Sequence, residues 1–256
     1  MIPLRDNIPS RTTPLVTYLI IGACTLAFLL QLAAGERGSQ IVEQYGMIPA
    51  RLTHPEAQLI VRRQVAVQTQ FGVESKVIEH QVAPPVIPAW LTVVTCMFLH
   101  GGWMHFLGNM WFLYVFGDNV EDRLGHIGYL LMYLCTGIIA ALAHYITDDA
   151  SMVPTIGASG AIAGVMGAYA WLYPHARVQA LLPLIVIMQL IIVPAPIFLG
   201  LWFAIQTFSG ISASAGGQAG GVAWWAHIGG FAAGILIALA VGRAHLGSDA
   251  VQERKF

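Results

Sequence analysis

A serine and a histidine in separate apolar stretches have the chemistry for acyl transfer. Ser159 stands in "GASGAIAGVMGAY" (157–169), and His227 stands much later in the chain, in "AHIGGFAAG" (226–234). A serine hydroxyl is a weak nucleophile until a neighbouring base accepts its proton, and histidine is the most common general base. We therefore predict that Ser159 is a nucleophile and His227 its base, if the fold brings them together. A buried structural histidine is the alternative interpretation.

A second pair of polar residues has the spacing of an oxyanion-binding group. His105 and Asn109 are four residues apart in "HGGWMHFLGNM" (100–110), so they share one face of a helix. Acyl transfer needs hydrogen-bond donors aimed at the developing oxyanion. The backbone N–H of Ser159, at a helix start, is a third candidate donor. Asn109 taken alone is equally consistent with a hydrogen bond between helices.

Other catalytic chemistries lack their residues. A membrane metalloprotease requires HExxH, which is absent, and His100 and His105 are five residues apart and point to different helix faces. An aspartyl protease needs an Asp within each of two spans, and no predicted span has one in its interior. Cys24, Cys96 and Cys135 form no CxxC pair and no metal spacing. We predict neither a metal nor a cofactor.

The elements that must position these residues are membrane-spanning helices. The 256 residues are 57% hydrophobic and 10% charged, whereas a soluble domain is about 25% charged. The charges are bunched, which leaves long uncharged intervals such as the one between Arg177 and Arg243. A spanning helix needs about 20 mostly apolar residues. We predict an all-α polytopic membrane protein with six spans, at residues 14–34, 102–119, 126–147, 159–173, 180–206 and 224–242.

The connections between these spans differ in length and composition. Residues 35–101 form a long first loop, residues 209–221 form a flexible connector rich in Gly and Ser, and the tail 243–256 is short and polar. No repeat or second domain is visible, so we interpret residues 1–256 as one membrane domain. No basic patch suggests binding to nucleic acid, and the lipid bilayer is the expected surrounding.

The positions of Lys and Arg predict the orientation of the spans. Basic residues precede the first span, lie between spans two and three and between spans four and five, and follow the sixth: Arg5, Arg11, Arg123, Arg177, Arg243, Arg254 and Lys255. The loops after spans three and five carry none. The positive-inside rule then predicts that both termini are cytoplasmic. Spans two, four and six begin at the opposite face, so His105, Ser159 and His227 are expected at similar depth.

Small residues at helical spacing predict a close approach of two helices. Gly157, Gly160, Gly164 and Gly167 recur along the fourth span, and the sixth span has its own small face, with Ala226, Gly230, Ala233 and Gly234. Helices in lipid associate by close packing, which small residues permit. Packing without chemistry is one interpretation. The other is that this approach sets the distance between the serine and the histidine.

Taken together, these residues resemble the rhomboid family of intramembrane serine proteases. The resemblance rests on "HGGWMHFLGNM", "EDRLG" (121–125), "GASGAIAGVMGAY" and "AHIGGFAAG", and "YGMIPARL" is similar to the start of the family's first loop. It implies a six-helix bundle that cleaves transmembrane substrates with a Ser–His dyad and without metal. By resemblance, Ser159 is the nucleophile and His227 the base, and His105, Asn109 and the Ser159 amide form the oxyanion hole.

The resemblance also implies supporting residues, partners and a location. Glu121 and Arg123 match a structural motif, and His100 matches a histidine that steadies the first loop. Expected partners are single-span or polytopic membrane protein substrates. The six-span form is typical of prokaryotes, so the expected location is the plasma (inner) membrane of a bacterium.

Two positions depart from the family pattern. Ala163 stands one turn below Ser159, where the family often has an aromatic residue against the histidine. Trp90-Leu91 stands where the first loop often has Trp-Arg. These departures leave the orientation of His227 and the anchoring of the loop open, and the polar stretch 54–85 receives no role.

Two other classes of function remain as alternatives. A catalytically inactive relative would only bind membrane clients, but such relatives usually lack the Ser or the His, and both are present here. A transporter would use discontinuous helices, for which Pro154 and "VPAP" (193–196) are candidate breaks. Against the transporter, no carboxylate or cation inside a span offers a coupling site.

Overall fold

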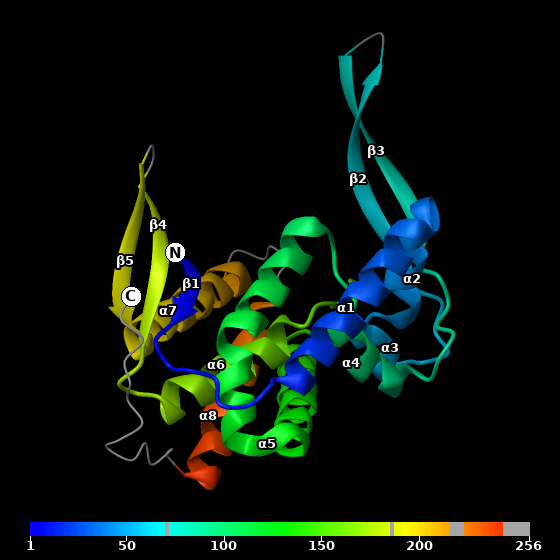
Figure 1. Cartoon of the computed structure of the whole chain (residues 1–256). Coiled ribbons are helices and arrows are strands. Elements are labelled where there is room, and N and C mark those ends of the chain that lie inside the picture. Colours follow the sequence, from blue (N-terminus) through cyan, green and yellow to red (C-terminus); the bar gives the residue numbers. More distant parts are fainter. Residues whose placement is uncertain (70–71, 185–186, 216–222, 243–256) are drawn as a thin grey trace.

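The apolar runs of the chain form long helices that pack around a central short one. A computed structural model describes residues 1–69, 72–184, 187–215 and 223–242. The helices that build its body are α1 (Leu15–Ala33), α5 (Trp103–Thr147), α6 (Ser159–Leu172), α7 (Ala195–Ala215) and α8 (Trp224–Val241) (Figure 1). Helix α5 consists of two helices that meet at Gly125, whose φ of 69° and ψ of 164° are not helical. These two halves correspond to predicted spans two and three.

In the described part of the chain, four helices are long and apolar enough to cross a membrane, namely α1, α5, α7 and α8. Helix α6 is apolar but has 14 residues. The protein is therefore a helical, polytopic integral membrane protein, as predicted from the composition. The number of six spans stays a prediction, because it counts α5 as two spans and the short α6 as another.

The predicted fifth span, 180–206, was wrong in its first half. Strands β4 (Arg177–Leu184) and β5 (Ile187–Pro194) form an antiparallel hairpin there, and α7 begins only at Ala195. The β-branched residues between Leu184 and Pro194 favour a strand, and Pro196 suits the first turn of a helix. Strand β1 (Ile2–Asp6) pairs with β4, so the sheet has the order β1-β4-β5.

The predicted loops are also more ordered than the composition indicated. Residues 209–215 of the predicted connector belong to the last turns of α7. Residues 216–222 and the predicted tail, 243–256, lie outside the described residues. The first loop contains α2 (Gly38–Tyr45), α3 (Pro49–Thr53), α4 (Thr92–Thr95) and three single 3-10 turns, at Gly35–Arg37, Ala89–Leu91 and Cys96–Phe98.

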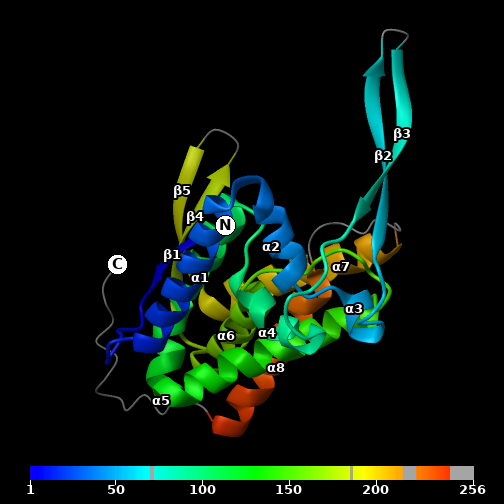
Figure 2. The same cartoon turned by 90° about the vertical axis from the view of Figure 1, so that its right-hand side faces the viewer.

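The polar stretch 54–85 forms a β-hairpin that projects from the body (Figures 1 and 2). Its strands are β2 (Ile60–Thr69) and β3 (Gly72–Gln81), paired in antiparallel register. The buried side chain of Arg51 fastens the base of the hairpin, because it donates hydrogen bonds to the backbone oxygens of Glu43 and Ala83. The structure therefore adds two small sheets to the predicted helical class.

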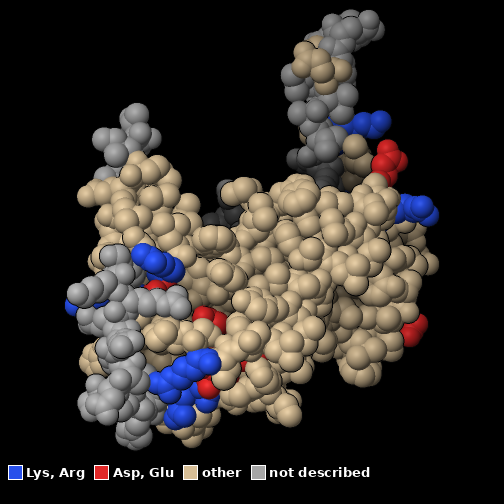
Figure 3. Space-filling view, viewed as in Figure 1, with Lys and Arg blue, Asp and Glu red and all other residues tan. Residues whose placement is uncertain are grey.

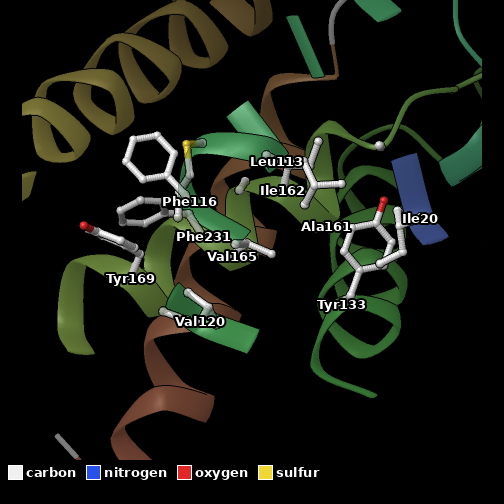
Figure 4. Packing of buried hydrophobic residues seen from close by; sticks show 14 of the residues in the cluster. Ile20, Leu113, Phe116, Val120, Tyr133, Ala161, Ile162, Val165, Tyr169 and Phe231 are labelled. Carbon is white, nitrogen blue, oxygen red and sulfur yellow. The ribbon is translucent and has the colours of Figure 1, made fainter. Parts of the chain in front are cut away.

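The core lies around α6, which is buried on nearly all sides. Phe116 of α5, Tyr169 of α6 and Phe231 of α8 gather on one side of it, while Ile20 and Tyr133 lie on the other (Figure 4). The rings of Phe116 and Tyr169 meet edge to face, with centroids 5.1 Å apart. Helix α6 thus contacts the other core helices directly, and its position determines where its first residue, Ser159, lies.

Glycines let α6 and α8 touch through their backbones. A Cβ atom on Gly230 would overlap the carbonyl oxygen of Gly160, and one on Gly234 would overlap that of Gly164. On the other side of α6, a Cβ on Gly160 would lie 2.6 Å from the Cβ of Ala140 in α5. The predicted contact between the small faces of these two helices is therefore confirmed.

Glu121 and Arg123, near the end of the first half of α5, bind the start of α1 and the end of α8. Glu121 accepts hydrogen bonds from the backbone N–H groups of Val16 and Thr17, both at 2.8 Å, and so caps the first turn of α1. Arg123 donates to the carbonyl oxygen of Gly242, just after α8, at 3.3 Å. These contacts join the start of α1 and the end of α8 to the first half of α5.

The outer surface fits a lipid environment. On the face shown in Figure 3, charged side chains gather towards the lower left and beside the β2–β3 hairpin, and most of the surface between them is uncharged. Leu19, Leu26 and Leu30 of α1 are more than half exposed. Such exposed leucines are expected where a helix faces lipid tails.

Replacing Gly234 by Ala tests the backbone contact between α6 and α8. The added methyl group has no room beside the carbonyl oxygen of Gly164, so the two helices must separate. Overpacking of this kind costs about 1–3 kcal/mol. We expect a lower melting temperature in detergent. Gly200→Ala is the matched control, because Gly200 in α7 has nothing within 4 Å of an added Cβ; equal melting temperatures for the two variants would contradict the contact.

Candidate active site

A cavity of about 570 Å³ lies where the starts of α5, α6 and α8 converge. Its walls come from these three helices, from residues 155–157 before α6 and from α7. The residues that line it include all four predicted reactive residues, His105, Asn109, Ser159 and His227. The structure therefore brings together side chains that are far apart in the sequence.

Ser159 and His227 are joined by a hydrogen bond. The distance from Ser159 Oγ to His227 Nε2 is 2.7 Å. Ser159 is the first residue of α6 and is partly exposed, while His227 lies in the first turn of α8 and is 8% exposed. The glycine contact between Gly160 and Gly230 lies directly beside this pair, so the backbone approach fixes the separation of the two side chains.

His105 and Asn109 turn their nitrogen atoms towards the segment before Ser159. A Cβ on Gly157 would lie 2.6 Å from His105 Nε2 and 3.6 Å from Asn109 Nδ2. The backbone N–H of Gly101 donates to His105 Nδ1 at 3.3 Å, so the ring proton belongs on Nε2. The Nδ2 group of Asn109 is buried and has no hydrogen-bond partner in the described structure. Two N–H donors therefore flank the same small space.

Gly157 is required at this position for two reasons. Its φ of 122° lies in the region that favours glycine, and any side chain would collide with the His105 ring. Its backbone N–H donates to the carbonyl oxygen of Cys96 at 2.9 Å. Because Gly157 has no side chain, the nitrogen atoms of His105 and Asn109 can lie beside the backbone just before α6.

The first loop holds the segment before α6 in place. Met47 and Thr155 exchange two backbone hydrogen bonds, at 3.1 and 2.7 Å, and the N–H of Ala50 donates to the carbonyl oxygen of Ser151 at 3.0 Å. Met47 and Ala50 belong to "YGMIPARL", so this motif supports the backbone that leads to Ser159.

His100 lies behind the cavity rather than in it. Its backbone is paired with the side chain of Gln31 near the end of α1, through bonds of 3.0 and 3.1 Å. Its ring packs edge-on against the rings of Phe28, His105 and Phe106. This arrangement ties the end of the first loop to α1.

Gln206 and Trp202 of α7 belong to the site and were missed by sequence reasoning. Gln206 Oε1 lies 2.6 Å from His227 Nδ1, and the rings of Trp202 and His227 have centroids 5.9 Å apart. A lone amide four residues after a tryptophan in an apolar helix was an available signal. It was overlooked because the predicted fifth span ended at residue 206, which put this glutamine at a helix end.

No group of three His, Cys, Asp or Glu side chains able to hold a metal ion occurs among the described residues. The acidic residues nearest in sequence to the oxyanion candidates, Asp118 and Glu121, lie towards the other end of this half of α5. The polar side chains that line the cavity carry hydroxyl, thiol, imidazole, amide and indole groups.

Comparison with known proteins decides the family. The rhomboid domain family matches residues 88–244, more than half of the chain. The chain belongs to the rhomboid family. The match contains His100, the four reactive residues and Gln206.

Relatives within the family come from bacteria and from organelles. The chain is 38% identical over 94 residues to Rhomboid-like protein 11, chloroplastic, of Arabidopsis thaliana, which is 37% of this chain and 31% of that protein. It is 33% identical over 168 residues to Rhomboid protease GluP of Bacillus subtilis, 62% of this chain and 32% of the relative. With Rhomboid protein 1, mitochondrial, of Saccharomyces cerevisiae, it shares 27% identity over 161 residues, 60% and 42% of the two chains. The matched parts thus span less than half of these relatives' lengths.

Replacing Asn109 by Ala separates a catalytic from a structural role. A donor that stabilises charge only in the transition state typically contributes about 10²–10³-fold in turnover. We expect a loss of this size with a nearly unchanged melting temperature, because Asn109 Nδ2 bonds to no other group in the described structure. Rate and melting temperature are measured on the same preparation. A large drop in melting temperature with normal turnover of the folded fraction would assign Asn109 to packing instead.

Proposed function

We propose that the protein is an intramembrane serine endopeptidase that cleaves membrane protein substrates with a Ser159–His227 dyad. The observation that carries this proposal is the 2.7 Å hydrogen bond between Ser159 Oγ and His227 Nε2 in a cavity with an unpaired buried donor, Asn109 Nδ2. Membership of a family whose relatives include one named a rhomboid protease supports it.

The arrangement supports a two-step acyl transfer. His227 Nε2 takes the proton of Ser159 as Oγ adds to the scissile carbonyl carbon. The oxyanion accepts hydrogen bonds from His105 Nε2, Asn109 Nδ2 and the Ser159 amide. The imidazolium then gives its proton to the leaving amine, which departs as the C–N bond breaks. A water molecule, activated by His227, hydrolyses the acyl-enzyme and restores the serine.

The lining of the cavity favours a substrate whose transmembrane helix is unwound at the cleaved bond. Most of its lining is apolar, and small residues such as Gly157 and Gly160 border Ser159. A peptide bond within a helix is shielded by its own turn, so a substrate must unwind to reach the serine. We expect single-span or polytopic membrane proteins with small residues at the cleaved bond and helix-weakening residues next to it.

An inactive, client-binding relative and a transporter are the rival functions. Both leave a serine without nucleophilic reactivity. A serine-reactive fluorophosphonate distinguishes them from a protease, because it labels only an activated serine. The presence of both dyad residues in hydrogen-bond contact supports the protease.

For the membrane, we propose that both termini are cytoplasmic and that the site opens towards the outer face of a bacterial plasma membrane. The pairing of β1 with β4 supports a shared side for the N-terminus and the segment after α6. That side carries Arg5, Arg11 and Arg177, as the positive-inside rule requires for the cytoplasm.

Single and double substitutions test the dyad. Ser159→Ala and His227→Ala should each abolish cleavage of a single-span substrate by the purified protein in detergent. The double variant should be no worse, because members of one catalytic unit are not additive. Substantial cleavage by Ser159→Ala protein would refute the assignment. Ile205→Ala, which changes an exposed residue of α7, is the control and should cleave normally.

Reporter fusions test the orientation. A reporter that is active only in the cytoplasm should be active after Phe256 and silent after Asp149, in the loop between α5 and α6. The opposite pattern would mean that the cavity opens towards the cytoplasm.

A further inference from the structure

His227 is held at both ring nitrogens. Nε2 meets Ser159 Oγ at 2.7 Å, and Nδ1 meets Gln206 Oε1 at 2.6 Å. The two partners come from different helices, α6 and α7. Gln206 also lines the cavity, and its hydrogen bond to the base has no place in the two-residue mechanism described above.

The second hydrogen bond determines which nitrogen of His227 carries the proton. An amide oxygen can only accept, so Nδ1 must be the protonated nitrogen of the neutral ring. Nε2 then keeps its lone pair and can take the proton of Ser159. In the other tautomer, Nε2 would carry a proton and could not act as the base. Gln206 therefore selects the reactive form of the imidazole.

A neutral amide suits this position better than a carboxylate. Among the residues that the structure describes, those that line the cavity include no Asp or Glu, and His227 is 8% exposed. Removing a carboxylate from water costs several kcal/mol unless other hydrogen bonds compensate. A glutamine orients the ring without that cost, whereas a glutamate would keep the oxygen acceptor and orient the ring but lower the melting temperature.

Helix α7 also supplies the aromatic contact that α6 lacks. Ala163, one turn below Ser159, presents only a methyl group. The Trp202 ring lies 5.9 Å from the His227 ring at 42°, one helical turn before Gln206. Trp224 meets the same imidazole edge-on at 6.3 Å. Trp202 of α7 and Trp224 of α8 therefore flank the His227 ring in place of an aromatic residue on α6.

We propose that Gln206 is a positioning residue that holds His227 in its reactive tautomer and orientation, so that the dyad is competent only while α7 lies against α8. This inference rests on the proposed function, since it assigns a role within the same site. It adds a third member to the dyad, contributed by α7 rather than by α6 or α8.

The test compares Gln206→Met with Gln206→Glu in cleavage of a single-span substrate by the purified full-length protein. Methionine has a similar length and no oxygen acceptor, whereas glutamate keeps the acceptor. Outer hydrogen bonds that orient a metal-ligating histidine are typically worth about 10- to 100-fold, and we expect an effect of the same order for His227. We expect kcat of Gln206→Met to fall by this factor with KM within about twofold of wild type, and Gln206→Glu to recover most of kcat. A purely structural role predicts no such rescue.

Matched controls keep the result interpretable. Ile205→Met makes the same replacement at the adjacent, lipid-facing position and should leave kcat and KM unchanged. Gln206→Asn keeps the amide but shortens the side chain, and it serves if Gln206→Met does not fold; we expect a similar fall in kcat with an unchanged melting temperature.

The outcomes separate this inference from the proposed function. Wild-type kcat for Gln206→Met or Gln206→Asn, or a Gln206→Glu variant as slow as Gln206→Met, would overturn the positioning role and leave the protease intact. Cleavage that persists in Ser159→Ala would instead overturn the protease itself.

Discussion

The backbone contact between α6 and α8 is the constraint on which the site depends. Ser159 and His227 lie in the first turns of two different helices, and a 2.7 Å hydrogen bond between them requires that these helices lie close together. Glycines meet carbonyl oxygens at Gly160–Gly230 and Gly164–Gly234. In lipid, where apolar exclusion gives no drive for association, such close packing supplies the attraction between helices. The same contact therefore stabilises the fold and sets the reacting distance.

One end of the molecule is held by structural contacts, and the other end contains the cavity. At one end, Glu121 caps α1, Arg123 meets the chain after α8, and β1 pairs with β4. At the other end, the starts of three helices converge on the cavity. Met47 of the first loop holds the segment before Ser159 through two backbone hydrogen bonds with Thr155. The described residues that line this cavity include no Asp, Glu, Lys or Arg. The cavity is therefore mostly apolar, although two hydroxyls, two imidazoles and two amides are among its lining groups.

Much of this arrangement was predictable from the sequence because it depends on local periodicity. Helical spacing of small residues predicted the contact of α6 with α8, and the spacing of His105 and Asn109 predicted their shared face. What failed depended on tertiary context. The apolar run 180–206 has no periodicity that separates a strand from a helix, so the β4–β5 hairpin was missed. Gln206 was missed because the predicted fifth span placed it at a helix end, and its contact with His227 Nδ1 depends on the packing of α7 against α8.

A crystal structure of the protein after reaction with a fluorophosphonate tests the central claim most directly, because the adduct mimics the tetrahedral intermediate. The account predicts phosphorus bonded to Ser159 Oγ, with the phosphoryl oxygen within hydrogen-bond distance of Asn109 Nδ2 and His105 Nε2. It also predicts that Gln206 remains bonded to His227 Nδ1. An adduct on another residue, or a phosphoryl oxygen directed away from α5, would contradict the account.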